Sequence, residues 1–435
     1  MRLERHAKRP ARSGGDSGAL LRPMLLLAVT VFIDLLGFGI VLPNLPRYIE
    51  IAVGQDHQQA GLIGGLLGAS YSFTQFLFAP LWGRWSDRVG RRPVILLSLI
   101  GVAASFTLFG LAGERLWMLF AGRLLAGVLS SASIGVAFAY VADVTTPQNR
   151  ARGMGVLGAC FGLGFVLGPA FGGVLGQYGV ALPAFVAAGM ALANFAFALR
   201  YLPESLKPEQ RAEHRARRDN AAVLLGKALT GPSRVLYLLS FLTILAFSAL
   251  EQIFSFYLLA VPALGVTPER QPLVTGGLLA VAGVLGAVVQ GGLIGRLVER
   301  FGEAGVIRGG IAAMVLGFVL FPLAPSVVRL AIGPLALLSV GRALAGPALN
   351  SLLSRKSTLG QGVTLSAQQS VEALGRAVGP VVAGALFNRS VSAPFYVSAA
   401  ILSVALVATL VRAADLLPPV EAAEIVGVDD AVVAA

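Results

Sequence analysis

The sequence predicts an all-α membrane protein with twelve transmembrane helices, arranged as two pseudo-symmetric bundles of six. Of its 435 residues, 56% are hydrophobic and 13% are charged, whereas a soluble domain carries about 25% charged residues. The apolar residues form runs of about 20 residues, the length of a helix that crosses a bilayer. Three short segments also recur in the same order in the two parts of the chain, which indicates an internal repeat.

The first span is expected directly after a basic N-terminal stretch. A signal peptide also begins with a basic stretch, but the apolar run here is too long for one and contains Asp34. We therefore expect this run to be retained as the first transmembrane helix. The predicted spans cover residues 24–46, 60–82, 93–112, 117–141, 153–176, 180–200, 235–261, 272–295, 306–324, 330–352, 363–388 and 391–412.

One long polar segment interrupts the series of spans. It contains prolines and many basic residues, which is typical of a loop between domains. The predicted organisation is a basic tail at 1–23, a first bundle at 24–201, a linker at 202–233, a second bundle at 234–412 and an acidic tail at 413–435.

Lysines and arginines are concentrated in the N-terminal tail and in every second loop after it. Loops that stay in the cytoplasm carry such an excess of positive charge. We therefore predict a multi-pass protein of the plasma (inner) membrane, embedded in the lipid bilayer, with both termini in the cytoplasm. These loops account for the net charge of +12, so nucleic acid is not an expected partner.

The internal repeat consists of three segments and their copies. They are Gly83–Gly90 with Gly295–Gly302, Gly122–Gly127 with Gly341–Gly346, and Gly168–Pro169 with Gly379–Pro380. The offsets are 212, 219 and 211 residues, as expected when loops differ in length. A repeat of six spans places the substrate site between two halves near the middle of the membrane, where access alternates between the two sides.

The first of these segments carries a resemblance to a known family. Its pattern resembles the signature loop between spans 2 and 3 of the major facilitator superfamily, and its residues are Gly83, Asp87, Arg88, Gly90, Arg91 and Arg92. Span 1 from Asp34 to Pro46, the end of span 4 at Asp143 and span 5 resemble the twelve-span drug/proton antiporters, especially the tetracycline-exporter group. The resemblance covers nearly the whole chain and implies the major facilitator fold and secondary active transport.

The signature segment is interpreted as a conformational latch. Gly83 and Gly90 are expected to bracket a tight loop, because glycine permits close backbone approach. The resemblance implies that Asp87 accepts hydrogen bonds from the N-terminus of span 11, across the interface between the halves. The basic residues Arg88, Arg91 and Arg92 are expected on the same surface as Asp143. Alternatively, these arginines only fix the topology.

Span 5 carries a glycine stripe and a proline. Gly164, Gly168, Gly172 and Gly176 recur every four residues, next to Pro169 and Gly173. Small residues at this spacing let helices pack closely, and proline loosens the helix. We interpret the motif as a bending interface between the halves, with plain tight packing as the alternative. By resemblance, this pattern is more typical of antiporters than of symporters.

Asp34 is the predicted proton carrier. It lies about 15 Å along span 1 at helical rise, and ionisable groups at such depth are costly and usually functional. The three histidines all lie outside the spans, which leaves carboxylates to carry the proton. Arg123 is the expected partner, because by resemblance spans 1 and 4 both line the cavity. The alternative is a structural hydrogen bond from Asp34 to a neighbouring helix.

Further polar residues within the spans are candidates for the substrate cavity. They are Tyr71, Gln75, Asn194, Glu251, Gln252, Gln290 and Asn350. Glu251 is interpreted either as a group that attracts a cationic substrate or carries a second proton, or as the partner of Arg342. Glu372 and Arg376 are four residues apart on span 11, a spacing that predicts a mutual ion pair.

The remaining patterns exclude several function classes. The chain has no phosphate-binding loop and no Cys/His cluster, so ATP hydrolysis, a metal and any other cofactor are not expected. We predict no enzymatic activity, but proton-coupled export of small hydrophobic or cationic compounds by a monomer. The alternatives are a proton symporter that imports a sugar, organic acid or other metabolite, and a transporter-like scaffold without flux.

Overall fold

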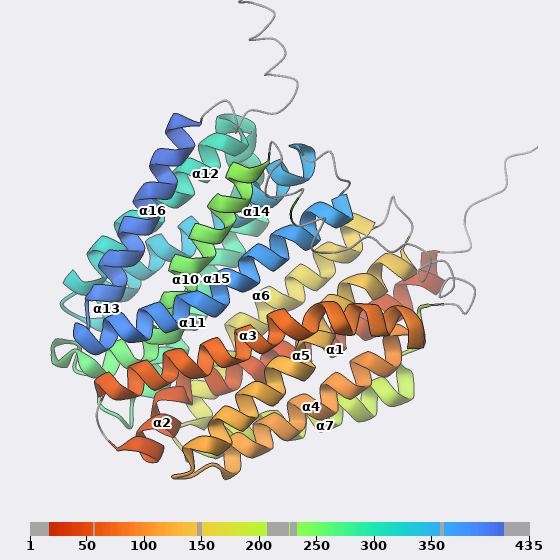
Figure 1. The fold of residues 1–435 in the computed structure, drawn as a ribbon, viewed down its shortest axis with the longest axis horizontal. Coiled ribbons are helices and arrows are strands. Elements are labelled where there is room, and N and C mark those ends of the chain that lie inside the picture. The colour runs from red at the N-terminus through yellow and green to blue at the C-terminus, as the bar shows by residue number, and fades with distance from the viewer. Residues whose placement is uncertain are drawn as a thin grey trace, which may run out of the picture.

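The computed structural model describes residues 17–54, 57–145, 150–206, 226, 233–356 and 361–412. The first part contains α1 (Ser17–Val41), the short 3-10 helix η1 (Leu42–Asn44), α2 (Leu45–Val53), α3 (His57–Val89), α4 (Arg91–Leu111), α5 (Leu116–Val144), α6 (Arg150–Leu175) and α7 (Leu182–Tyr201) (Figure 1). The second part contains α10 (Arg234–Ala260), α11 (Gln271–Val288), the π-helix η3 (Val289–Leu293), α12 (Ile294–Leu320), α13 (Val327–Leu330), the π-helix η5 (Ala331–Leu335), α14 (Ala336–Lys356), α15 (Gln361–Arg389) and α16 (Ala393–Val411). The predicted acidic tail, most of the linker and residues 1–16 of the basic tail lie outside the described residues.

Among the described residues, eleven helical segments are long and apolar enough to cross a membrane. One of them, Gln271–Leu323, has 53 residues and contains two spans. They meet at Gly302, whose φ of 67° interrupts the helical backbone. The all-α fold with twelve spans that the sequence predicts is therefore confirmed.

Two helices extend further than the sequence predicts. The first span continues through η1 and α2 to Val53, because the two prolines there occupy helix starts. The prediction of a loop that begins at Gly83 is wrong, since α3 remains helical to Val89. The break is the single residue Gly90, whose φ of 110° is a conformation that favours glycine.

The helices alternate in direction, so the start of α1 and the end of α16 lie on the same side. We call this the linker side; it also holds Gly90, Gly302 and the end of α14. The other end of the spans is called the opposite side. Helices up to α7 pack mainly on one another, as do helices from α10 onward, and the two halves meet along α3 with α15 and α6 with α11. In Figure 1 the halves diverge toward the linker side.

The hydrophobic core is divided in the same way. A large cluster of buried side chains joins both halves and includes Ile40 and Tyr48 from the first and Phe254 and Phe321 from the second. A smaller cluster around Leu27 and Tyr140 belongs to the first half alone and lies on the linker side. The halves therefore share a core only toward the opposite side.

Small residues bring the halves together at two equivalent places. A Cβ atom on Gly276 of α11 would collide with the carbonyl oxygen of Pro169 in α6. In the same way, a Cβ atom on Gly65 of α3 would collide with the carbonyl oxygen of Pro380 in α15. The second contact is the copy of the first, because Gly276 follows Gly65 by 211 residues and Pro380 follows Pro169 by the same repeat offset.

The glycine stripe of span 5 has a different role from the predicted one. A Cβ atom on Gly164 would lie 2.7 Å from Cβ of Leu35, and one on Gly168 would lie 2.7 Å from Cα of Gly39. The stripe thus packs on α1 within the first half, because its four-residue spacing keeps it on a single face of α6. Pro169 and Gly173 of the predicted motif face the other half, and a Cβ atom on Gly176 would lie 2.9 Å from Cβ of Pro272 in α11.

Toward the linker side, the glycines of α6 and α11–α12 have open space around them. A Cβ atom would meet no neighbour within 4 Å at Gly155, Gly158, Gly162, Gly291, Gly292 or Gly295. The last cross-half glycine contact in this direction is Gly283 against Val166. The halves are therefore in contact on the opposite side and apart on the linker side.

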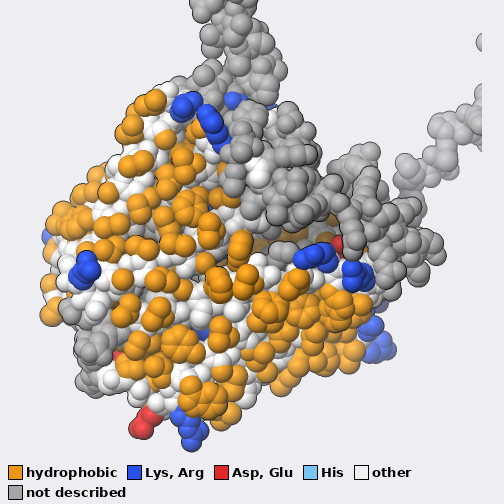
Figure 2. Space-filling model, viewed as in Figure 1, with side chains coloured by type: hydrophobic (Ala, Val, Ile, Leu, Met, Phe, Trp, Pro, Cys, Tyr) orange, Lys and Arg blue, Asp and Glu red, His pale blue; other side chains and the backbone are white. Residues whose placement is uncertain are grey.

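The exterior is largely apolar. Figure 2 shows hydrophobic side chains over most of the visible face, with Lys and Arg side chains toward its margins. Large exposed apolar residues lie on the spans themselves, for example Phe73, Val288 and Val404. Such a surface is suited to contact with lipid rather than water.

Candidate functional site

Tyr71 of α3 is the centre of the polar cluster in the first half. Its hydroxyl lies 3.0 Å from Oγ of Ser130 on α5, and Nε2 of Gln75 donates to it at 3.3 Å. The guanidinium carbon of Arg123 lies 5.9 Å from the Tyr71 ring centroid and 5.2 Å from that of Phe109. A cation over an aromatic face is stabilised most where water is excluded, and Arg123 is only 6% exposed.

Asp34 of α1 and Arg376 of α15 also lie within electrostatic range of Tyr71. Tyr71 therefore lies near both the predicted proton carrier and its predicted partner. Arg376 belongs to the second half, so the cluster also extends across the interface. The Nε atom of Arg123 has no hydrogen-bond partner among the described residues.

The second half carries a matching set of charges. Glu251 of α10 is exposed and lies within electrostatic range of Arg376 and Arg342. Arg342 of α14 lies over the ring of Phe247, with 5.8 Å from its guanidinium carbon to the centroid. Arg342 and Arg123 are thus repeated residues that each pack on an aromatic ring.

Glu372 and Arg376 form the ion pair that their spacing predicts. Nη1 of Arg376 lies 3.5 Å from Oε2 of Glu372. The other carboxylate oxygen accepts a hydrogen bond of 3.1 Å from Nε2 of Gln368, which also contacts Oγ of Ser240 at 3.3 Å and Oδ1 of Asn350. Gln368 is not among the predicted site residues, and its only signal in the sequence is its position four residues before Glu372 on the same helix face.

The other predicted cavity residues have different surroundings. Asn350 and Gln290 are exposed, the latter within η3. Gln252 packs against Gly68 of α3, so it lies at the interface between the halves. Asn194 is buried and donates from Nδ2 to the carbonyl oxygen of Thr30 at 2.8 Å. This bond ties α7 to α1 within the first half.

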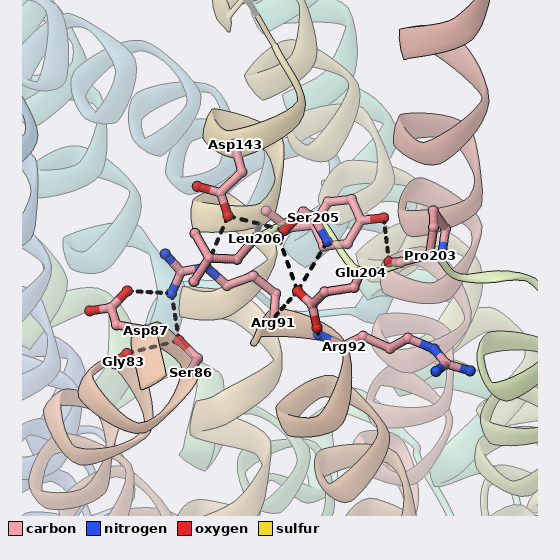
Figure 3. A network of polar contacts seen from close by, with 11 residues as sticks. Gly83, Ser86, Asp87, Arg91, Arg92, Asp143, Pro203, Glu204, Ser205 and Leu206 are labelled. Atoms are coloured by element: carbon pink, nitrogen blue, oxygen red, sulfur yellow. Dashed lines mark hydrogen bonds and ion pairs between the residues drawn. The ribbon is translucent and has the colours of Figure 1, made fainter. Parts of the chain in front are cut away.

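A second polar network lies on the linker side and is built around Arg91 (Figure 3). The Arg91 guanidinium contacts Asp87 at 2.6 Å and Asp143 at 3.0 Å, and it donates to Oγ of Ser86 at 2.6 Å. Its side chain is only 4% exposed. Desolvating a guanidinium is costly unless it is paired, and these three partners compensate it. The network joins the ends of α3, α4 and α5.

Glu204 completes this network from the segment after α7. Its carboxylate accepts hydrogen bonds from the backbone N–H groups of Arg91 at 2.8 Å and Arg92 at 3.2 Å. These groups are at the start of α4, where the helix supplies no acceptors. A carboxylate there is also favoured by the helix dipole. Glu204 could not be identified from the sequence, because nothing local shows that the segment after α7 returns to the start of α4.

The latch residues are therefore brought together only in part. Asp87, Arg91 and Asp143 form one cluster, and Gly90 positions it. Arg92 donates to the carbonyl oxygen of Leu199 at 2.5 Å, whereas Arg88 is exposed. The expected cross-half partner of Asp87 is the N-terminus of span 11, where residues 357–360 and the side chains of 361–363 lie outside the description.

Comparisons with known proteins place this geometry in context. A family model described as Major Facilitator Superfamily matches residues 27–379. The tetracycline resistance protein, class C, of Escherichia coli is 33% identical over 374 residues, covering 85% of this chain and 90% of that protein. Multidrug resistance protein 2 of Bacillus subtilis (strain 168) is 28% identical over 398 residues, covering 89% and 94%.

A solved structure agrees over nearly the same extent. The crystal structure of the human organic anion transporter MFSD10 (TETRAN) has a TM-score of 0.67 and 28% sequence identity to this chain. The match covers 89% of this chain and 99% of that one. The agreement therefore includes both halves.

Proposed function

The chain belongs to the major facilitator superfamily, and from this premise we propose that it is a proton-coupled exporter of small hydrophobic or cationic compounds that works by alternating access. We place it in the plasma (inner) membrane with both termini in the cytoplasm. The observation that supports this most directly is that Asp34 and Arg123 of one half and Arg376 of the other all lie within electrostatic range of Tyr71. Charges inside spans are costly, and they mark ion and substrate pathways.

Asp34 is the proposed proton carrier. Within a span its carboxylate is disfavoured in the charged form unless a positive group is near. Movement of one half relative to the other changes the distance from Tyr71 and Arg123 to Arg376. The balance of charge at Asp34 then depends on which side is open, so the carboxylate can take a proton on one side and release it on the other.

Glu251 is the proposed contact for a cationic substrate. Of the three carboxylates well inside the spans, it is the exposed one, whereas Glu372 is engaged by Arg376 and Gln368. The relatives named for tetracycline and multidrug resistance support an exporter.

A second candidate is transport of an organic anion, as in the proton symport of an organic acid. The two repeated arginines favour it, because Arg123 and Arg342 contact aromatic rings but have no ion-pair partner among the described residues. The name of the human relative as an organic anion transporter adds weight to this candidate.

Proton release from the purified protein tests the proposal. We expect lipophilic cations or tetracycline-like compounds to release protons near neutral pH, and Asp34→Asn to abolish this release because it removes the carboxylate that is proposed to carry the proton. Glu114→Gln, at an exposed loop position, is the matched control and should behave as the wild type. Glu251→Gln keeps Asp34 as the proton-binding group, so proton release should persist. Release by cations should weaken by about tenfold, because the loss of about 1.4 kcal/mol of binding free energy lowers affinity by that factor.

Two outcomes would contradict this assignment. Unchanged release in Asp34→Asn would remove Asp34 from proton coupling. No release with any cation, together with alkalinisation outside vesicles when organic acids or sugars are added, would make the symporter the better description.

A further inference from the structure

Helices α6 and α15 are copies of each other at an offset of 211 residues, and they pack through corresponding faces. In α6, Gly164 packs on α1 of its own half and Gly173 packs on α11 of the other half. In α15, their copies Gly375 and Gly384 pack on α10 of its own half and on α3 of the other half. Each helix therefore has a sector between these two faces, and the two sectors carry equivalent positions.

On α15 this sector faces the space between the halves. Arg376 lies about 100° around the helix from Gly375 and about 80° from Gly384, at 3.6 residues per turn. It is within electrostatic range of Tyr71 of the first half and of Glu251 of the second. Glu372, one turn before it, is its partner in the ion pair. The sector of α15 thus presents an ion pair to the space between the halves.

On α6 the same two positions are aromatic. The copies of Glu372 and Arg376 are Phe161 and Phe165, again four residues apart on one helix face. Phe165 is 42% exposed although it lies in the sector between α1 and α11. The repeat has kept the packing of the helix and exchanged an ion pair for two phenyl rings. The two halves therefore present different chemistry to the space between them.

Further rings extend this surface over the neighbouring helices. Phe165 lies edge-on to Phe38 of α1, with 6.3 Å between the ring centroids, and Phe38 lies 5.9 Å from the ring centroid of Tyr71. Phe161 stacks on Phe138 of α5, with 6.1 Å between centroids and 10° between the ring planes. We call Phe38, Phe138, Phe161 and Phe165 the aromatic wall.

We propose that the aromatic wall binds the ring system of the transported compound while Glu251 of the second half takes its positive group, so that the preferred substrates are aromatic cations. Ring faces and edges stack on other rings in defined geometries, and a ring face also attracts positive charge. Phe38 is one turn from Asp34 on α1, so a compound on this wall lies beside the proposed proton carrier. The inference rests on the proposed function and gives it a substrate class.

Two cations with the same charged centre test the wall. Tetraphenylphosphonium carries four aromatic rings, and tetrabutylphosphonium carries only alkyl chains. Their binding to the purified full-length protein in detergent can be measured by isothermal titration calorimetry. We expect the wild type to prefer tetraphenylphosphonium. Phe165→Leu keeps an apolar side chain but removes the ring, so it should raise the Kd of tetraphenylphosphonium about fivefold, the size of one lost aromatic contact. The Kd of tetrabutylphosphonium should not change.

Matched variants separate the ring from the fold and from the charge. Phe165→Trp should retain the preference, and Phe161→Leu should reduce it as Phe165→Leu does, even if the latter does not fold. Phe73→Leu, at a 56% exposed phenylalanine on α3, is the control and should bind both cations as the wild type does. Glu251→Gln should weaken both cations alike, because it removes only the charge.

The outcomes distinguish the aromatic wall from the proposed exporter. Equal weakening of both cations in Phe165→Leu and Phe161→Leu, no weakening in either variant, or a wild type without preference for tetraphenylphosphonium would overturn the wall. If tetraphenylphosphonium binds with the expected dependence on Phe165 but releases no protons, proton-coupled export is wrong and the aromatic wall stands.

Discussion

At the scale of single residues, Glu204 stabilises the linker-side end of the first half. It lies in the exposed segment after α7, yet it accepts hydrogen bonds from the start of α4. We expect Glu204→Ala to lower the stability of the protein by about 1–2 kcal/mol, because it removes the acceptor of two N–H groups at the start of α4. Thermal unfolding in detergent measures this. Glu114→Ala, an exposed acid in the loop before α5, is the control. Equal melting temperatures for both variants would show that water replaces the carboxylate without loss.

The residues of this network differ in how far they can be predicted. Asp87, Arg91 and Asp143 could be expected to share a surface, because helix ends on one side of a membrane are close together. Their pairing could not, since it depends on rotamers set by the single-residue break at Gly90. Glu204 was beyond reach for another reason: its partner in α4 is 113 residues away.

At the scale of helices, the contacts of Gly65 and Gly276 hold the opposite side closed. We expect Gly65→Ala and Gly276→Ala each to increase the linker-side-closed population, because the new Cβ meets the backbone of Pro380 or Pro169 and the helices must separate. Overpacking of this kind costs about 1–3 kcal/mol. Spin labels at Tyr201→Cys and Val411→Cys in a Cys160→Ser background, exposed at the linker-side ends of α7 and α16, measure the shift by pulsed EPR in nanodiscs.

Gly189→Ala is the matched control for this prediction. It lies in α7, where a Cβ atom has no neighbour within 4 Å, so the populations should not change. A similar shift in Gly189→Ala would mean that helix propensity, rather than the contact between halves, controls the equilibrium.

The sequence predicts that each helix exists, but it does not predict which helices pack on one another. Apolar length predicts each span, because a bilayer leaves the backbone no alternative to the helix. The glycine stripe of α6 correctly indicated close packing, yet it faces α1 rather than the other half. A glycine stripe indicates that a helix face can pack closely, but it does not indicate which neighbouring helix packs on it.

At the scale of the whole molecule, the basic loops define a direction across the membrane. We expect a membrane-impermeant maleimide to label Tyr178→Cys in intact cells, and Val411→Cys only after permeabilisation, both in the Cys160→Ser background. Tyr178 and Val411 are 77% and 75% exposed on the opposite side and the linker side. The reverse pattern would place the termini outside the cell.

The position of the contacts between the halves has a mechanical consequence. Pro169 on Gly276 and its copy act as a fulcrum near one end of the molecule, and α6 from Pro169 back to Arg150 is a lever arm of about 28 Å at helical rise. A tilt of about 10° there moves the far end by about 5 Å over that length. Small changes at the fulcrum are thus amplified at the linker side, where the halves are apart. A compound bound between these glycines and prolines would therefore control an opening with which it makes no contact.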